Sequence, residues 1–151
     1  MTTLSTVLTG SLLTHREAEQ VASAIEAAER RTSGEIKVVI TRHCWTTLER
    51  KAAKIIEECR LDQTAERAAV LILIVAANRE LIIRGDQGIN AKVAPDFWDD
   101  VRDVMVDAFS QSAYARGLCD GIQLIADKLA VVFPACETAR NELSNEIAYA
   151  D

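Results

Sequence analysis

The chain has 151 residues, of which 49% are apolar and 26% charged, and a formal net charge of −6. This length and apolar content predict one soluble domain over residues 1–151 with a sizeable buried core. The acidic balance argues against nucleic acid as a partner, because phosphate backbones would be repelled. It also argues against an anionic lipid surface. No apolar run approaches the roughly 18 residues that a membrane helix needs, so direct membrane insertion is not expected.

The N-terminal segment and the cysteines indicate the compartment. Residues 1–13 contain no Lys or Arg and no unbroken apolar stretch, so they do not resemble a secretory signal. The cytoplasm is therefore the expected location. The four cysteines form no C-x-x-C pair, which makes a zinc site a poor interpretation. Cys44 beside His43 leaves a thiol-based redox role as a minor hypothesis.

The first predicted elements are a helix and a strand. Thr14 and Glu17 form a capping box, in which each side chain accepts a hydrogen bond from the other residue's backbone, and this predicts a helix start. Ser33-Gly34 is expected to end that helix, because glycine readily adopts positive φ. Glu35–Thr41 then alternates as a strand does. Residues 1–12, before the helix, are expected to be a flexible N-terminus.

A second helix and a hairpin are expected next. A capping box that begins at Thr46 predicts a helix to about Arg60. The continuous apolar run Val70–Val75 is typical of a strand covered on both faces. Ala77-Asn78 predicts a tight turn into a strand at Leu81–Ile83, which would pair antiparallel with the preceding strand.

The remaining third of the chain reads as helical. Gly85–Gly88 is predicted to be a loop, and a helix is expected from Pro95. A last helix over Tyr114–Val132 should end near Pro134, and residues 135–151 are expected to form an irregular tail. The order is α-β-α-β-β-α-α. Strands that are apolar on both faces need helices on both sides, so the predicted fold is a three-layer α/β/α sandwich around a small mixed sheet.

Short segments spread along the chain carry a family resemblance. They are Arg31–Val39, Val70–Ile74, Arg84–Ile89, Asp96–Asp99, Gly117–Ile122 and Asn141–Ile147. Read in order from about Leu12, they resemble the TPM domain family, which includes a thylakoid-lumen acid phosphatase, a photosystem II repair factor and many bacterial proteins. The resemblance implies an α/β/α sandwich, a divalent-cation site that takes Ca²⁺ in some members, and phosphatase activity in some.

One position departs from the family pattern. Family members often carry Asn-Gly just before the second strand, where this chain has Ala68-Ala69. The amide oxygen of an asparagine can ligate a hard cation, whereas the alanine side chain has no atom that can bind one. The departure therefore argues against both cation binding and catalysis.

Three carboxylates are the predicted ligands for Ca²⁺ or another divalent cation: Glu35, Asp86 and Asp96. Glu35 begins a strand, Asp86 lies between two glycines, and Asp96 opens an acidic helix start. Ca²⁺ prefers carboxylate and carbonyl oxygens, and the resemblance covers all three positions. Each also has a purely structural interpretation, as a solvated carboxylate, a turn-forming aspartate and a complement to the helix dipole respectively.

These observations favour a non-catalytic module that binds an unidentified protein partner and, as a further expectation, a divalent cation. A metal-assisted acid phosphatase that hydrolyses phosphomonoesters is the alternative, and it rests on family analogy. No nucleophile with an adjacent base stands out, and Ala68 replaces a candidate ligand. No catalytic residue is therefore assigned.

Overall fold

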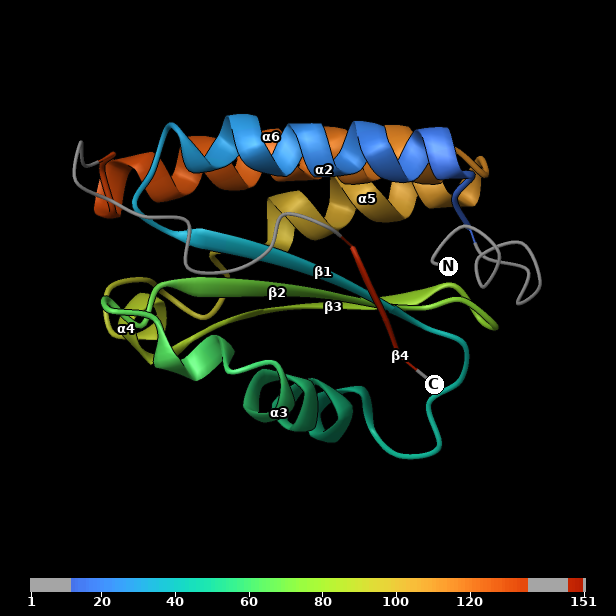
Figure 1. The fold of residues 1–151 in the computed structure, drawn as a ribbon, viewed down its shortest axis with the longest axis horizontal. Coiled ribbons are helices and arrows are strands. Elements are labelled where there is room, and N and C mark those ends of the chain that lie inside the picture. Colours follow the sequence, from blue (N-terminus) through green and yellow to red (C-terminus); the bar gives the residue numbers. More distant parts are fainter. Residues whose placement is uncertain (1–11, 136–146, 151) are drawn as a thin grey trace.

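The computed structural model describes residues 12–135 and 147–150, and in it a four-stranded sheet lies between two helical layers (Figure 1). Three helices cover one face: α2 (His15–Glu29), α5 (Asp99–Ser110) and α6 (Tyr114–Val132). The other face is covered by α3 (Leu48–Glu58), which leads into the 3-10 turn η1 (Leu61–Gln63). The predicted three-layer α/β/α sandwich is confirmed.

The sheet is mixed, as predicted. Its strands are β1 (Glu35–Thr41), β2 (Ala69–Val75), β3 (Glu80–Gly85) and β4 (Ala148–Ala150). They lie in the order β3-β2-β1-β4, in which β1 is parallel to both of its neighbours and β3 is antiparallel to β2. The predicted hairpin is therefore present, and Glu35 at the start of β1 pairs with Ala69 at the start of β2.

Alternation along the two central strands divides the core. One set of side chains packs under α2, α5 and α6: Ile36, Val38, Ile40, Val70, Ile72 and Ile74. The intervening set packs against α3: Val39, Ala69, Leu71 and Leu73. Because both faces are apolar, helices must cover both, which is why the continuous run in β2 indicated a buried strand.

The helix starts show which capping prediction was correct. At α2 the capping box is complete, since Thr14 N–H donates to Glu17 Oε1 at 2.9 Å and Glu17 N–H donates to Thr14 Oγ1 at 3.1 Å. At α3 the prediction was wrong by one residue. Thr47, not Thr46, accepts the N–H of Arg50, at 3.2 Å. Arg50 cannot return the bond as a glutamate would, so this cap is one-sided.

The first helix is shorter than predicted. α2 ends at Glu29 rather than at Ser33-Gly34, because Thr32 pairs antiparallel with Pro134 and the N–H of Ser33 donates to Phe133 O at 3.0 Å. Similarly, α5 begins at Asp99 rather than at Pro95, after a run of turns. α6 covers the predicted residues.

Besides the 3-10 turn η1, two elements were not predicted. The expected loop over Gly85–Gly88 contains the start of a short helix, α4 (Gln87–Asn90), and β4 lies in the tail that was expected to be irregular. Both are too short to produce a periodic pattern. The rest of the predicted tail and N-terminus, residues 1–11, 136–146 and 151, lies outside the described residues. Within the described parts of the chain, no helix combines the length and apolar composition of a membrane span.

Candidate functional site

The sheet brings two of the three predicted ligands to one end, where β1 and β2 begin; we call this the amino end. Glu35 opens β1, and Asp86 follows β3 with its N–H donating to Ala69 O at 2.9 Å. Both residues are buried, with 4% and 8% of their surface exposed. Asp96 is exposed in the turns before α5, where its carbonyl accepts the N–H of Asp99.

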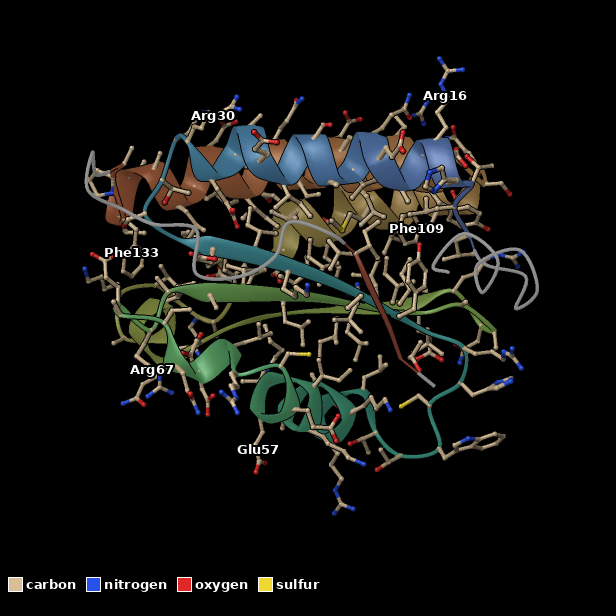
Figure 2. All side chains as sticks on the ribbon, viewed as in Figure 1. Arg16, Arg30, Glu57, Arg67, Phe109 and Phe133 are labelled. Atoms are coloured by element: carbon tan, nitrogen blue, oxygen red, sulfur yellow. The ribbon has the colours of Figure 1, made fainter. Side chains whose placement is uncertain are left out.

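The Asp86 carboxylate is already paired with Arg67. Arg67 Nε lies 2.7 Å from Asp86 Oδ2, and Arg67 Nη2 lies 3.0 Å from Oδ1, so both oxygens accept from one guanidinium. These bonds raise the pKa of Arg67. Arg67 belongs to the segment that joins η1 to β2, and in Figure 2 it lies next to α4. The sequence contains no signal for this pair, because its members are 19 positions apart.

Gly88 has a packing role that the sequence pattern did not show. Its N–H donates to Arg67 O at 2.8 Å. A Cβ at this position would lie 2.2 Å from Glu66 O and 2.6 Å from Arg67 O. Only glycine allows α4 to approach this backbone, so the second glycine of the Gly-Asp-x-Gly pattern serves to hold Arg67 against Asp86.

One carboxyl group at the amino end was missed in the sequence. Glu29, the last residue of α2, accepts the N–H of Ile36 at its Oε2, at a distance of 2.9 Å. Burial raises the pKa of Glu29 to about 7, and the negative charge of Glu35 adds to this effect, while the bond from Ile36 opposes it. In the sequence Glu29 is an ordinary helical glutamate, and only the turn into β1 places it beside Glu35.

The departure from the family pattern falls between these carboxylates. Ala68 and Ala69 are both 2% exposed, and their carbonyl groups accept the N–H groups of Glu35 and Asp86 respectively. Among the residues that the structure describes, no three His, Cys, Asp or Glu side chains gather closely enough to hold a metal ion. The cation site at Glu35, Asp86 and Asp96 stays a prediction.

The opposite end of the sheet, where β1 and β2 finish, has a different character; we call it the carboxyl end. The loop from β1 to α3 carries Trp45, which is 91% exposed. The His43 ring lies 5.3 Å from the Trp45 ring, centroid to centroid, at an interplanar angle of 32°. The loop therefore presents a supported aromatic pair to solvent.

Beside this pair lies a hollow of about 340 Å³ between the loop and the β2–β3 hairpin. Its lining residues are Cys44, Thr46, Thr47, Leu48, Glu49, Val75, Asn78 and Glu80. The Cys44 thiol donates to Thr46 O, with Sγ 3.1 Å from the oxygen, while His43 packs on Trp45. The Cys44 thiol thus bonds backbone carbonyl oxygens rather than an imidazole base, which argues against the redox hypothesis.

Comparison with known proteins identifies the family. A family model described as the TPM domain matches residues 7–128. The chain belongs to the TPM domain family. This TPM domain is similar to the BA42 protein of the psychrophilic bacterium Bizionia argentinensis, whose NMR structure superposes with a TM-score of 0.87 at 33% sequence identity. That match covers 91% of this chain and 95% of BA42.

A second solved structure shares the fold of this TPM domain. It is the N-terminal domain of a protein from P. gingivalis, with a TM-score of 0.66 and 19% identity over 81% of this chain and 79% of that one. At this identity the likeness concerns the fold alone. No curated protein matches the sequence. The family predicted from the short segments is thus confirmed.

Proposed function

We propose that this TPM domain is a non-catalytic module that binds a protein partner through the carboxyl end of its sheet. The observation that carries the proposal is the exposure of Trp45, at 91%. A large aromatic side chain left in water contributes nothing to folding, yet its burial against a partner would release considerable apolar surface. Tryptophan is also among the residue types that dominate binding energy at protein interfaces.

The surroundings of Trp45 suit a contact surface. Its ring is supported by His43, so less side-chain entropy is lost on binding than for an isolated ring. The neighbouring hollow of about 340 Å³ can receive a side chain of the partner. In open α/β sheets, ligands bind outside the carboxyl ends of the strands, which is where this loop lies.

The amino end supports a non-catalytic reading. Asp86, the best-placed candidate by sequence, has both carboxylate oxygens engaged by Arg67. A carboxylate held in this way would have to exchange a bidentate arginine for a cation or a proton before it could act. The pair therefore serves to anchor the backbone before β2 to α4.

Partner capture from the host, compared between variants, tests the proposal. Trp45→Ala should lose the partner, whereas Val131→Ala, which trims another apolar side chain that is 81% exposed on α6, should retain it. Titration of the captured partner into the pure domain should change the tryptophan fluorescence of the wild type. Equal capture by both variants, or no captured partner at all, would contradict the proposal.

The second candidate is a metal-assisted phosphatase, and the Glu29–Glu35 pair favours it. Two adjacent carboxylates repel each other, which contributes to the raised pKa of Glu29, and a divalent cation would relieve that repulsion. This candidate predicts that Ca²⁺ shifts the backbone amide signals of residues 34–36, and that a generic phosphate ester is turned over by the wild type but not by Glu35→Gln. The absence of both effects with Ca²⁺, Mg²⁺ and Mn²⁺ would eliminate it.

A further inference from the structure

The two edges of the sheet differ in how they are closed. At one edge β4 pairs with β1 over residues 148–150. At the other edge β3 pairs with β2, and no strand in the described part of the chain lies on its outer side (Figure 1). An open strand edge is a template for pairing with another chain.

The backbone groups that face outward from β3 follow from the ladder. The register pairs Gly85 with Val70, so Asp86 lies opposite Ala69, and the N–H of Asp86 donates to Ala69 O at 2.9 Å. Facing residues in an antiparallel ladder are hydrogen-bonded at every second position. The backbone groups of Leu81, Ile83 and Gly85 therefore point away from β2.

One of these outward groups is satisfied within the chain. The side-chain amide of Asn90 donates to Gly85 O at 2.9 Å, which caps the end of the open edge. For the outward backbone groups of Leu81 and Ile83, no hydrogen bond to another described residue is found. The open part of the edge is thus short and centred on Ile82.

The side chains along this open part are self-complementary. The strand reads Glu80-Leu-Ile-Ile-Arg84, with opposite charges at the two ends and apolar residues between them. Two copies placed antiparallel about Ile82 would set Glu80 of each opposite Arg84 of the other. Leu81 would then face Ile83, and these are the two residues whose backbone groups point outward, so both pairs would be hydrogen-bonded.

We propose that two copies of this domain associate edge to edge through β3, in an antiparallel pairing centred on Ile82. Glu80 and Arg84 are both exposed and lie on the same face of the strand as Ile82. No residue in the described part of the chain forms an ion pair or hydrogen bond with the Arg84 side chain. Glu80 accepts from the side-chain amide of Asn78, which leaves acceptor sites on its carboxylate for a guanidinium.

The flank of the strand is open enough for a second chain. A hollow of about 420 Å³ adjoins the carboxyl-terminal half of β3, between Ile83 and the segment that carries Val93, Pro95 and Trp98. A strand from a different protein could use the same backbone groups. The charges match a second copy best, because a two-fold axis pairs Glu80 of each copy with Arg84 of the other and so forms the same ion pair twice. The contact is small, so the association is weak and concentration-dependent.

A concentration series tests the proposal with four proteins. Wild type should move from monomer to dimer between tens of micromolar and about one millimolar in sedimentation and NMR diffusion measurements, with added protection of the Leu81 and Ile83 amides. Glu80→Arg and Arg84→Glu should each stay monomeric, because like charges would face each other. The double variant Glu80→Arg/Arg84→Glu should dimerise again.

Mixing the two single variants provides the most specific test of the pairing. Glu80→Arg and Arg84→Glu, each monomeric alone, should pair when combined, because every charge then faces its opposite. Glu57→Arg, a matched charge reversal on the outer side of α3 (Figure 2), should dimerise as the wild type does. A wild type that stays monomeric throughout, or single variants that dimerise normally, would overturn the proposal. Glu80 also lines the hollow beside Trp45, but the pairing does not use Trp45 itself. Trp45→Ala should therefore dimerise as the wild type does even when it loses partner capture, which separates the two proposals.

Discussion

The two ends of the sheet differ in whether their conspicuous side chains make structural contacts or lie exposed to solvent. At the amino end, Arg67, Asp86 and Gly88 join the backbone before β2 to α4, and Glu29 accepts a backbone bond from β1. At the carboxyl end, the loop after β1 leaves Trp45 almost fully exposed beside a hollow. Of the charged residues that look functional in the sequence, Asp86 is thus occupied in holding the fold, while Trp45 at the other end has nearly all of its side chain in water.

This contrast shows that residue type alone is a weak guide to function. An aspartate between glycines is typical of ligand-binding loops, but the same aspartate can bind an arginine of its own chain. The solvent exposure of a large apolar side chain such as Trp45, by contrast, is visible only in the folded molecule. The following predictions test whether side chains at the amino end stabilise the fold and whether Trp45 at the carboxyl end does not. They run from the largest expected effect on stability to the smallest.

Gly88→Ala should have the largest effect. The added Cβ would meet the carbonyl oxygens of Glu66 and Arg67 at 2.2 and 2.6 Å, which the backbone can relieve only by moving α4 away. Overpacking of this kind costs about 2–3 kcal/mol of unfolding free energy, measured by urea denaturation. Gln87→Ala, at an exposed position of the same helix, is the control and should be near neutral. A stable Gly88→Ala domain would show that α4 is not held as described.

Arg67→Met should lower the urea midpoint, because it leaves the Asp86 carboxylate buried without its partner. The double variant Arg67→Met/Asp86→Asn should recover part of the loss, since no unpaired charge then remains. Arg30→Met, which breaks the exposed pair with Glu26, should change the midpoint much less. If both arginine variants behave alike, the amino end has no special structural role for this pair.

Glu29 predicts a pH dependence of stability. Its pKa is about 7 in the folded domain against 4.5 for the ordinary carboxyl group, so the folded state holds the proton more tightly. The stabilisation is complete below pH 4.5 and is lost as the pH rises to about 7. Glu29→Gln should therefore be more stable than wild type at pH 8 and about equal at pH 4, by thermal melts. The exposed Glu26→Gln should not change the slope, and parallel curves for Glu29→Gln would contradict the assignment.

Trp45→Ala should have the smallest effect on stability. Its side chain is 91% exposed, so we expect a change within about 0.5 kcal/mol in the free energy of unfolding. The variant should retain the wild-type urea midpoint while losing partner capture, and this combination is what separates a binding residue from a structural one. A marked drop in the midpoint would mean that the loop depends on the Trp45–His43 contact.

Several features could be predicted from the chain because they depend on near neighbours. The capping box of Thr14 and Glu17, the continuous apolar run of β2 and the hairpin into β3 all reflect local backbone preferences and periodicity. Short elements were missed for the same reason. α4 and β4 are only 4 and 3 residues long, too short to show a period. The shift from Thr46 to Thr47 arose because either threonine can supply the capping oxygen.

By itself, the sequence determined the layered α/β/α fold and the burial of the central strands, because alternation and helical spacing are properties of consecutive residues. The family followed from the resemblance of its short segments. Only the tertiary structure decided what the carboxylates do. Sheet register placed Glu35 and Asp86 at one end, and a left-handed residue, Arg67 with φ of 53°, turned the chain so that its guanidinium met Asp86. Such contacts join residues far apart in the chain, so no local pattern encodes them.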